Sequence, residues 1–251
     1  MQDRDQLEVI QGKIIKGLLG LPKATPYWGI LHELKILPVH LKLTYKKLMI
    51  YHMLMNSPES RITRKIVEAQ ETSGLDNCWF HDVKTEGEKI GLTVEKSEVV
   101  DVLKSAWKKT VKTKIKKAFE HECNEKIGNT TKLRFLKKTS ATDTYLKELS
   151  NDDARDAIKI RLNMVDMVTQ NFGRRTNCIL CGDDNDNTEH VFLCPLLGDH
   201  GLTVNDLING TKMMRVVQLF RRMEQLRRDA LIDNIITNYN VFHREELAMG
   251  G

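Results

Sequence analysis

The sequence predicts a mostly α-helical protein, organised as one or more multi-helix bundles with a small Cys-Cys-His-Cys (CCHC) zinc module. Apolar residues recur at three- and four-residue spacing through most of the 251-residue chain. Proline and glycine separate these periodic stretches and mark helix ends, whereas the alternating pattern of strands is nearly absent. We expect four segments: a helical segment over 1–73, a linker with a lysine-rich amphipathic helix over 74–149, a helix plus the zinc module over 150–200, and C-terminal helices over 201–251.

The first segment is expected to contain short helices separated by proline-marked corners. Thr25 can cap the second of these helices, with Pro26 in the first helical position, where proline's missing N–H is not needed. Pro38 opens the third helix, and Pro58 breaks it. The expected helices cover residues 6–20, 26–34, 38–55 and 61–70.

A long amphipathic helix is expected over residues 96–127, after a less regular stretch in which Gly91 ends a helix. Gly128 and Asn129 stop the long helix. Its apolar residues share one side, which predicts that this side is buried. They are Val100, Leu103, Trp107, Val111, Ile115 and Phe119.

Capping residues mark the helices that follow. Ser150 and Asp153 fit a capping box at the start of a helix, and a short helix is expected over 203–208. Thr211 is expected to cap a long final helix. The apolar residues of this final helix suit a bundle edge or a short coiled coil. They are Val216, Leu219, Met223, Leu226 and Ala230.

Four potential zinc ligands lie within seventeen residues, in a Cys-x2-Cys-x8-His-x3-Cys pattern. They are Cys178, Cys181, His190 and Cys194. Thiolate sulfur and imidazole nitrogen are the ligands of closed tetrahedral zinc sites. The first two cysteines suit a tight turn, and either Asn187 or Thr188 can cap a short helix that carries the histidine and the last cysteine on one face.

Other interpretations of these residues are a chance cluster, or a redox pair formed by Cys178 and Cys181. A redox Cys-x-x-Cys usually starts a helix after a strand, and no such context flanks this pair. His200 is an alternative ligand. Because protein atoms take all four coordination positions, we expect the zinc to have a structural role and not a catalytic one.

The positive charge of the chain is concentrated on the long amphipathic helix. The total excess is mild, with 39 Lys and Arg against 34 Asp and Glu, but seven lysines and no acid occupy positions 104–117. Nucleic-acid phosphate is the partner that such a run favours, and a solvated helix face is the alternative. The expected phosphate contacts are Lys104, Lys108, Lys109, Lys112 and Lys116.

Arginines supply further candidate contacts. Arg174 and Arg175 precede the zinc run and can contact nucleic acid, or can instead complement a helix dipole. The arginine pairs at 221–222 and 227–228 are expected on a solvated face. The loop between the zinc ligands is acidic and would repel phosphate, so the zinc is expected to act as a scaffold. The acids of this loop are Asp183, Asp184, Asp186 and Glu189.

No membrane span, secretion signal or catalytic constellation is expected. The chain lacks an apolar run of about 18 residues and a signal-peptide layout. Five cysteines without framework spacing argue against an oxidising compartment. We expect an intracellular location, with the nucleus as the narrower candidate, and no small-molecule substrate. Gly182-Asp183-Asp184 lies inside the zinc run and not on a hairpin, and Glu33 stands in a Glu-x-Lys without a partnering Pro-Asp, so no enzyme is predicted.

Two stretches resemble the reverse transcriptases of non-LTR (LINE-type) retrotransposons. Residues 18–52, LLGLPKATPYWGILHELKILPVHLKLTYKKLMIYH, resemble the region that follows the polymerase core. Residues 157–195, which include CILCGDDNDNTEHVFLCP, look like the zinc-binding segment near the C-terminus of those proteins. Together with the lysine-rich helix, the resemblance covers about residues 10–200 in the same order. It implies a thumb-like segment, a linker and a CCHC zinc region, with RNA template and target DNA as partners.

The polymerase core of that family is missing from this sequence. Its catalytic aromatic-x-Asp-Asp hairpin and the other metal-binding aspartates do not occur, and a polymerase needs two or three carboxylates around magnesium. Some relatives carry a nuclease after the zinc run, but residues 196–251 contain no Pro-Asp or Glu-x-Lys. This chain alone is therefore not expected to polymerise or to cut nucleic acid.

The expected function is that of a nucleic-acid-binding, zinc-stabilised C-terminal piece, or a truncated or domesticated copy, of such a reverse transcriptase. RNA, DNA or both would be the partner. An alternative is an interaction module whose helices and zinc knuckle dock another polypeptide and have no nucleic-acid role. An enzymatic role would require a polymerase core encoded upstream of Met1.

Overall fold

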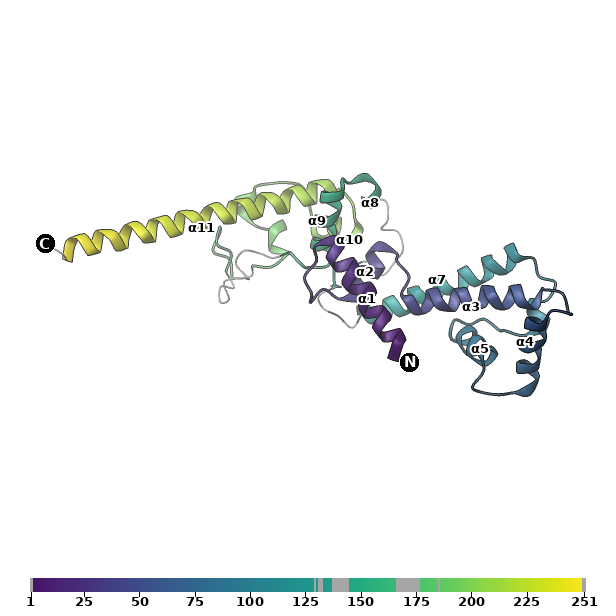
Figure 1. Ribbon diagram of the computed structural model, residues 1–251. Coiled ribbons are helices and arrows are strands. Elements are labelled where there is room, and N and C mark those ends of the chain that lie inside the picture. Colours follow the sequence, from purple (N-terminus) through teal and green to yellow (C-terminus); the bar gives the residue numbers. More distant parts are fainter. Residues whose placement is uncertain are drawn as a thin grey trace. The chain divides into compact units, whose positions relative to one another are not determined.

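The computed structural model describes residues 2–128, 130, 133–136, 145–165, 177–184 and 186–249 (Figure 1). Over these residues the chain forms helices and no strand, which confirms the predicted mostly α-helical class. The α-helices are α1 (Gln2–Leu19), α2 (Tyr27–Leu34), α3 (Val39–Met55), α4 (Ile62–Ser73), α5 (Trp79–Lys89), α6 (Lys96–Val99), α7 (Lys104–Gly128), α8 (Tyr145–Glu148), α9 (Asn151–Arg161), α10 (Val204–Asn209) and α11 (Met213–Met249). Two short 3-10 helices are η2 (His190–Phe192) and η3 (Pro195–Leu197). Within the described ranges, no helix combines the length and the apolar character that crossing a membrane requires.

The helices cluster into two compact units whose chain segments alternate. The first unit comprises Met1–Leu18 and Leu34–Asn129, and the second comprises Leu19–Glu33 and Thr130–Gly251. The short stretch that holds most of α2 therefore packs with the C-terminal half of the chain. These boundaries follow packing, whereas the four segments expected from the sequence follow composition and motif order.

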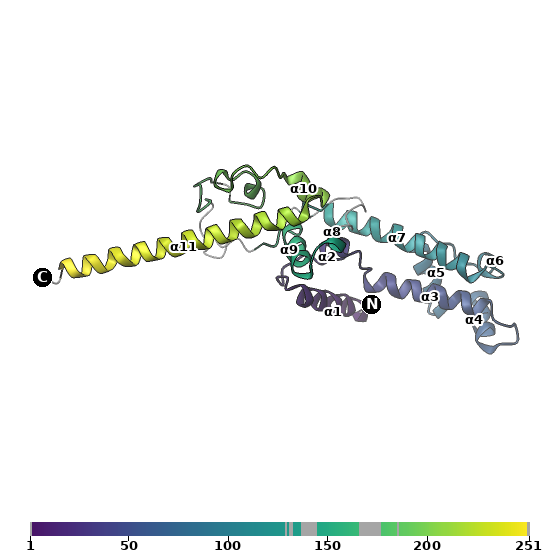
Figure 2. The same cartoon turned by 90° about the horizontal axis from the view of Figure 1, so that it is seen from above.

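The first unit is centred on α3 and α7, which lie side by side (Figures 1 and 2). Trp107 of α7 donates its indole N–H to the Leu48 carbonyl of α3 at 3.1 Å, and the His52 ring stacks on the indole with centroids 5.9 Å apart. Helices α4 and α5 pack on α3 and on each other. The apolar side of α7 is buried at four-residue intervals, as the periodicity predicts for most of its length. Its buried residues are Trp107, Val111, Ile115, Phe119, Cys123 and Ile127.

The long helix expected over 96–127 is broken, and this part of the prediction is wrong. Between α6 and α7, Val100 is extended and Asp101 has a φ of 63°. The side chain of Asn56 stabilises the break, because its amide N–H donates to the Val99 carbonyl at 3.0 Å and its oxygen accepts the Asp101 N–H at 3.0 Å. Leu103, expected in the buried stripe, is consequently 75% exposed.

The predicted helix caps have mixed outcomes. Ser150 accepts the N–H of Asp153 at 3.2 Å and starts α9, as expected. Thr25 does not cap α2, because its hydroxyl accepts no N–H from the described residues; it donates to the Pro22 carbonyl at 2.7 Å and closes the preceding turn. Thr211 does not cap α11 either, because its hydroxyl likewise only donates, to the Asp206 carboxylate at 2.9 Å.

In the second unit, α9, α10 and the two 3-10 helices pack along the first half of α11. The core between them is apolar and includes the side chains of Val191 and Phe192 from η2 and of Val216, Phe220 and Met223 from α11. Beyond position 227, the side chains of α11 whose burial is described are half-buried or exposed.

A buried ion pair joins α2 to the rest of this unit. The Arg161 guanidinium of α9 donates to the Glu33 carboxylate of α2 at 2.6 Å, and both side chains are fully buried. The Tyr145 hydroxyl donates to the same carboxylate, while a second guanidinium nitrogen donates to the backbone carbonyls of Leu207 and Ile208 at the end of α10. Glu33 is therefore a structural residue that ties three helices together.

Candidate metal centre

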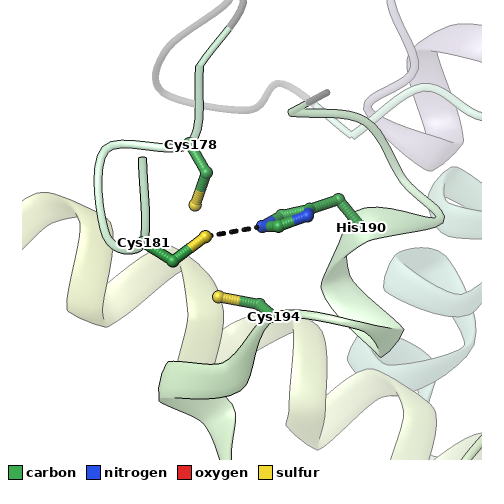
Figure 3. Close-up of side chains that lie close together, drawn as sticks. All are labelled: Cys178, Cys181, His190 and Cys194. Carbon is green, nitrogen blue, oxygen red and sulfur yellow. Dashed lines mark hydrogen bonds between the residues drawn. The ribbon is translucent and has the colours of Figure 1, made fainter. Parts of the chain in front are cut away.

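The four predicted ligands come together at one point of the second unit. The Sγ atoms of Cys178, Cys181 and Cys194 and a ring nitrogen of His190 all lie within 4.8 Å of one another, and Figure 3 shows the three sulfurs and the imidazole directed toward a common centre. Ligands around a tetrahedral zinc ion, with Zn–S bonds of about 2.3 Å, are about 3.8 Å apart. The four side chains could therefore hold a metal ion after small movements.

A tight turn places the first two cysteines. The Cys178 N–H donates to the Asp183 carbonyl at 2.7 Å, and the Gly182 N–H donates to the Cys178 carbonyl at 2.8 Å. Gly182 has a φ of +80°, a left-handed conformation that glycine adopts without strain. Cys178 is buried and Cys181 is half-buried, so the turn presents one sulfur to the core and the other nearer to its edge.

A capped turn places the histidine and the last cysteine. The Asn187 side-chain oxygen accepts the N–H groups of Glu189 and His190, each at 2.9 Å. Of the two caps expected from the sequence, Asn187 therefore takes the role, and the Thr188 hydroxyl instead donates to an asparagine of the α9 end. The Cys194 N–H donates to the His190 carbonyl at 2.8 Å, which brings both side chains to one side of the turn.

The thiols of Cys178 and Cys194 differ in pKa. Burial by itself raises the pKa of the Cys178 thiol, but hydrogen bonds from the backbone at Cys181 and Leu180 and from side chains outweigh it and hold this pKa below its ordinary value. Burial raises the pKa of Cys194 to about 11. The Cys181 sulfur lies 3.3 Å from His190 Nε2. Since metal ligands must be deprotonated, a cation bound here would displace protons.

A buried arginine of α11 touches the same cluster. Arg227 was expected on a solvated face, yet its side chain is 1% exposed and forms an ion pair with Asp186, which is equally buried. Its Nη2 atom also makes a long N–H···S contact of 4.0 Å with Cys178. The signal was available, because Arg227 lies four positions after Met223 on the apolar side of the helix.

His200, the alternative ligand, is outside the four-residue group. Its Nδ1 accepts the N–H of Leu202 at 3.1 Å, and its ring packs edge-on near Phe192 with centroids 6.5 Å apart. The histidine of the centre is therefore His190, as the spacing predicts.

The acidic loop between the ligands is partly neutralised within the unit. Asp186 pairs with Arg227, and Glu189 pairs with Arg134 at 3.3 Å. Asp184 accepts a hydrogen bond from the side chain of Asn177.

The lysines expected to contact phosphate are all exposed on α7 of the first unit. Lys104, Lys108, Lys112 and Lys116 recur every four residues, the last three each one position after a buried residue of α7, and Lys109 lies beside them. Lys116 has a carboxylate within 4.0 Å, that of Glu120 at 3.8 Å; for the other four, the described part of the chain has no ion pair within this distance. Arg174 and Arg175, the other predicted contacts, lie outside the described residues.

Comparison of the chain with protein-family models, with curated proteins and with solved structures finds no significant match. The resemblance to non-LTR retrotransposon reverse transcriptases therefore stays a prediction.

Proposed function

We propose that Cys178, Cys181, His190 and Cys194 bind a structural zinc ion. The convergence of three sulfurs and one imidazole supports this proposal, because soft thiolates with imidazole in a tetrahedral arrangement suit zinc better than the hard cations magnesium and calcium. With four protein ligands, no position remains for water, so the ion would hold the second unit together instead of taking part in chemistry.

Metal analysis of the purified protein tests the zinc. We expect one zinc per chain by atomic emission, and a cobalt-substituted protein with the absorption of a tetrahedral, thiolate-rich site. A protein that contains no zinc and takes up no cobalt after refolding would contradict the proposal.

We further propose that the chain is a nucleic-acid-binding C-terminal piece of a non-LTR retrotransposon reverse transcriptase, with RNA, DNA or both as partner and without a polymerase active site of its own. The resemblance of residues 18–52 and 157–195 supports the family, and the row of exposed lysines on α7 supports nucleic-acid binding. Lys104, Lys108 and Lys112 recur every four residues along one side of the helix and have no carboxylate within 4.0 Å among the described residues, which suits a run of backbone phosphates. An intracellular location, more narrowly the nucleus, accords with this role.

Gel shifts with structured RNA and with duplex DNA test the lysine row. We compare Lys108→Glu/Lys112→Glu on α7 with Lys42→Glu/Lys46→Glu on α3. Both pairs are exposed, have the same spacing and change the charge equally. The α7 change should weaken binding by at least tenfold and reduce the slope of log affinity against log salt by about two on duplex DNA, whereas the α3 change should have a smaller effect. Equal effects of the two variants, or binding that salt does not weaken, would contradict the assignment.

A second candidate function is docking of another polypeptide on the zinc module. Two apolar side chains beside the last ligand favour it, because Leu193 is 76% exposed and Leu196 is 55% exposed. In that case the α7 variant would bind nucleic acid no worse than wild type, and Leu193→Ser/Leu196→Ser would remove the interaction with the partner.

A further inference from the structure

Arg227 occupies an unusual position for an arginine. It continues the buried side of α11, where Val216, Phe220 and Met223 precede it, and its guanidinium ends against the metal-ligand cluster. A charged side chain is seldom buried without a specific partner, since loss of its hydration is costly. Here the partners are the Asp186 carboxylate and the Cys178 sulfur.

We propose that Arg227 is a positioning residue of the metal centre, which orients the Cys178 sulfur and the ligand loop and couples metal binding to the docking of α11. This inference rests on the proposed zinc site and extends it to a residue that is not a ligand.

The position of the guanidinium beside a ligand supports this role. A zinc ion with three thiolates and one neutral imidazole would carry a net charge of −1, so a guanidinium beside a sulfur interacts favourably with it, although the Asp186 carboxylate on the same guanidinium leaves the total at −1. The Arg227 guanidinium lies on the Cys178 side of the cluster, where its Nη2 is 4.0 Å from the sulfur. An N–H directed at a thiolate lowers the basicity of the sulfur and fixes its orientation, as outer partners of metal ligands commonly do.

The contacts of Arg227 also connect the ligand loop with α11. Asp186 lies between the two pairs of ligands, and its carboxylate is held by the guanidinium. Within the same loop, the Asp183 carbonyl accepts the N–H of Cys178. The same nitrogen, Nη2, contacts both the carboxylate and the sulfur, and the planar guanidinium fixes the directions of its two N–H groups, which a freely rotating lysine ammonium does not. Metal loss would therefore loosen the loop, the arginine and the first half of α11 together.

Zinc affinity and cobalt spectra of full-length variants test this role. We compare Arg227→Met with Arg228→Met, which removes a neighbouring arginine that is exposed and pairs with Glu224 on the surface. Arg227→Met should bind zinc about 10- to 100-fold more weakly in competition with a chromophoric chelator. Its sulfur-to-cobalt charge-transfer band should move to longer wavelength, because a thiolate without an N–H donor releases electron density more easily. Arg228→Met should match wild type in both measurements.

The conservative variant Arg227→Lys provides a second test in case Arg227→Met does not fold. Arg227→Lys retains the charge and loses the planar fork, so its zinc affinity should fall between those of wild type and Arg227→Met, or below wild type if the methionine variant is insoluble. The inference is overturned if the Arg227 variants match Arg228→Met in affinity and in spectrum. That outcome would leave the zinc proposal intact, whereas a wild-type protein that binds neither zinc nor cobalt would overturn the zinc site itself.

Discussion

The two units of this protein are stabilised in different ways. In the first unit, α7 buries side chains that recur every four residues and α3 buries mostly apolar ones at helical spacing, and the burial of each large apolar side chain contributes about 1.5–3 kcal/mol. In the second unit the core is shared among short helices and turns, and two buried arginines pair with buried acids. The first unit therefore depends mainly on a repeated apolar pattern, with the buried Glu86 carboxylate paired to Lys47, whereas the second adds two buried arginine–acid pairs and the proposed metal to its apolar core.

The largest expected effect on stability comes from a comparison in which one cysteine of each unit is replaced by alanine. Cys194→Ala removes a proposed ligand of the second unit, while Cys123→Ala removes a buried thiol from α7 of the first. Cys194→Ala should abolish zinc binding and most of its contribution to folding, which is about 10–16 kcal/mol in zinc-finger peptides. Cys123→Ala should cost about 1 kcal/mol through a small cavity. Zinc analysis measures metal binding, and denaturant unfolding measures the stability of each variant. Equal destabilisation by the two changes would contradict a metal-dependent second unit beside a metal-independent first unit.

The next largest effect measures how much the buried Glu33–Arg161 ion pair contributes to the stability of the second unit. Glu33→Gln leaves the Arg161 guanidinium buried without its carboxylate and should destabilise the unit by about 3–5 kcal/mol. Glu224→Gln in the same unit removes the carboxylate of a surface pair with Arg228 and should cost at most about 0.5 kcal/mol. Urea unfolding compares the two variants. A similar small loss for both would show that α2 is held by apolar contacts alone.

The smallest effect is a dependence of the first unit on pH. His40 contacts Glu8 at 2.9 Å and Glu122 at 3.1 Å. Burial lowers the pKa of His40, but the hydrogen bonds to Glu122 and Glu8 outweigh it and raise this pKa above its usual value. Protonated His40 therefore stabilises the folded state below about pH 6.5, and this contribution is lost as the pH rises through the raised pKa.

His40→Gln measures this contribution. The difference in unfolding free energy between wild type and His40→Gln should be below about 1 kcal/mol at pH 5.5 and should shrink toward pH 8.5. Groups that titrate equally in wild type and in His40→Gln do not affect this difference in unfolding free energy. A difference that does not change with pH would therefore contradict the stabilisation by protonated His40.

The sequence predicted what depends on local pattern. The helical class, the buried stripe from Trp107 onward, the Ser150 cap and the four residues of the metal centre all follow from spacing along the chain. The Cys-x2-Cys turn is local as well, so its geometry could be expected from the positions of Cys178 and Gly182.

The features that were missed depend on residues far apart in the chain. The break before α7 is stabilised by Asn56, more than forty positions earlier than the backbone groups it binds. Glu33 and Arg161 are 128 positions apart, so neither charge could be assigned to the core from its neighbours. Arg227 looked like half of an exposed basic pair, although its place on the apolar side of α11 already indicated that it points inward.

In the proposal above, a bound metal ion holds the second unit together, whereas the first unit does not need it. Peptide-resolved hydrogen exchange, measured with and without a zinc chelator, tests this most directly. We expect chelation to accelerate exchange in the ligand loop, α9, α10 and the first half of α11, and to leave exchange in α3 and α7 unchanged. If the chelator leaves exchange in the second unit unaltered, the proposal that the metal holds this unit together is contradicted.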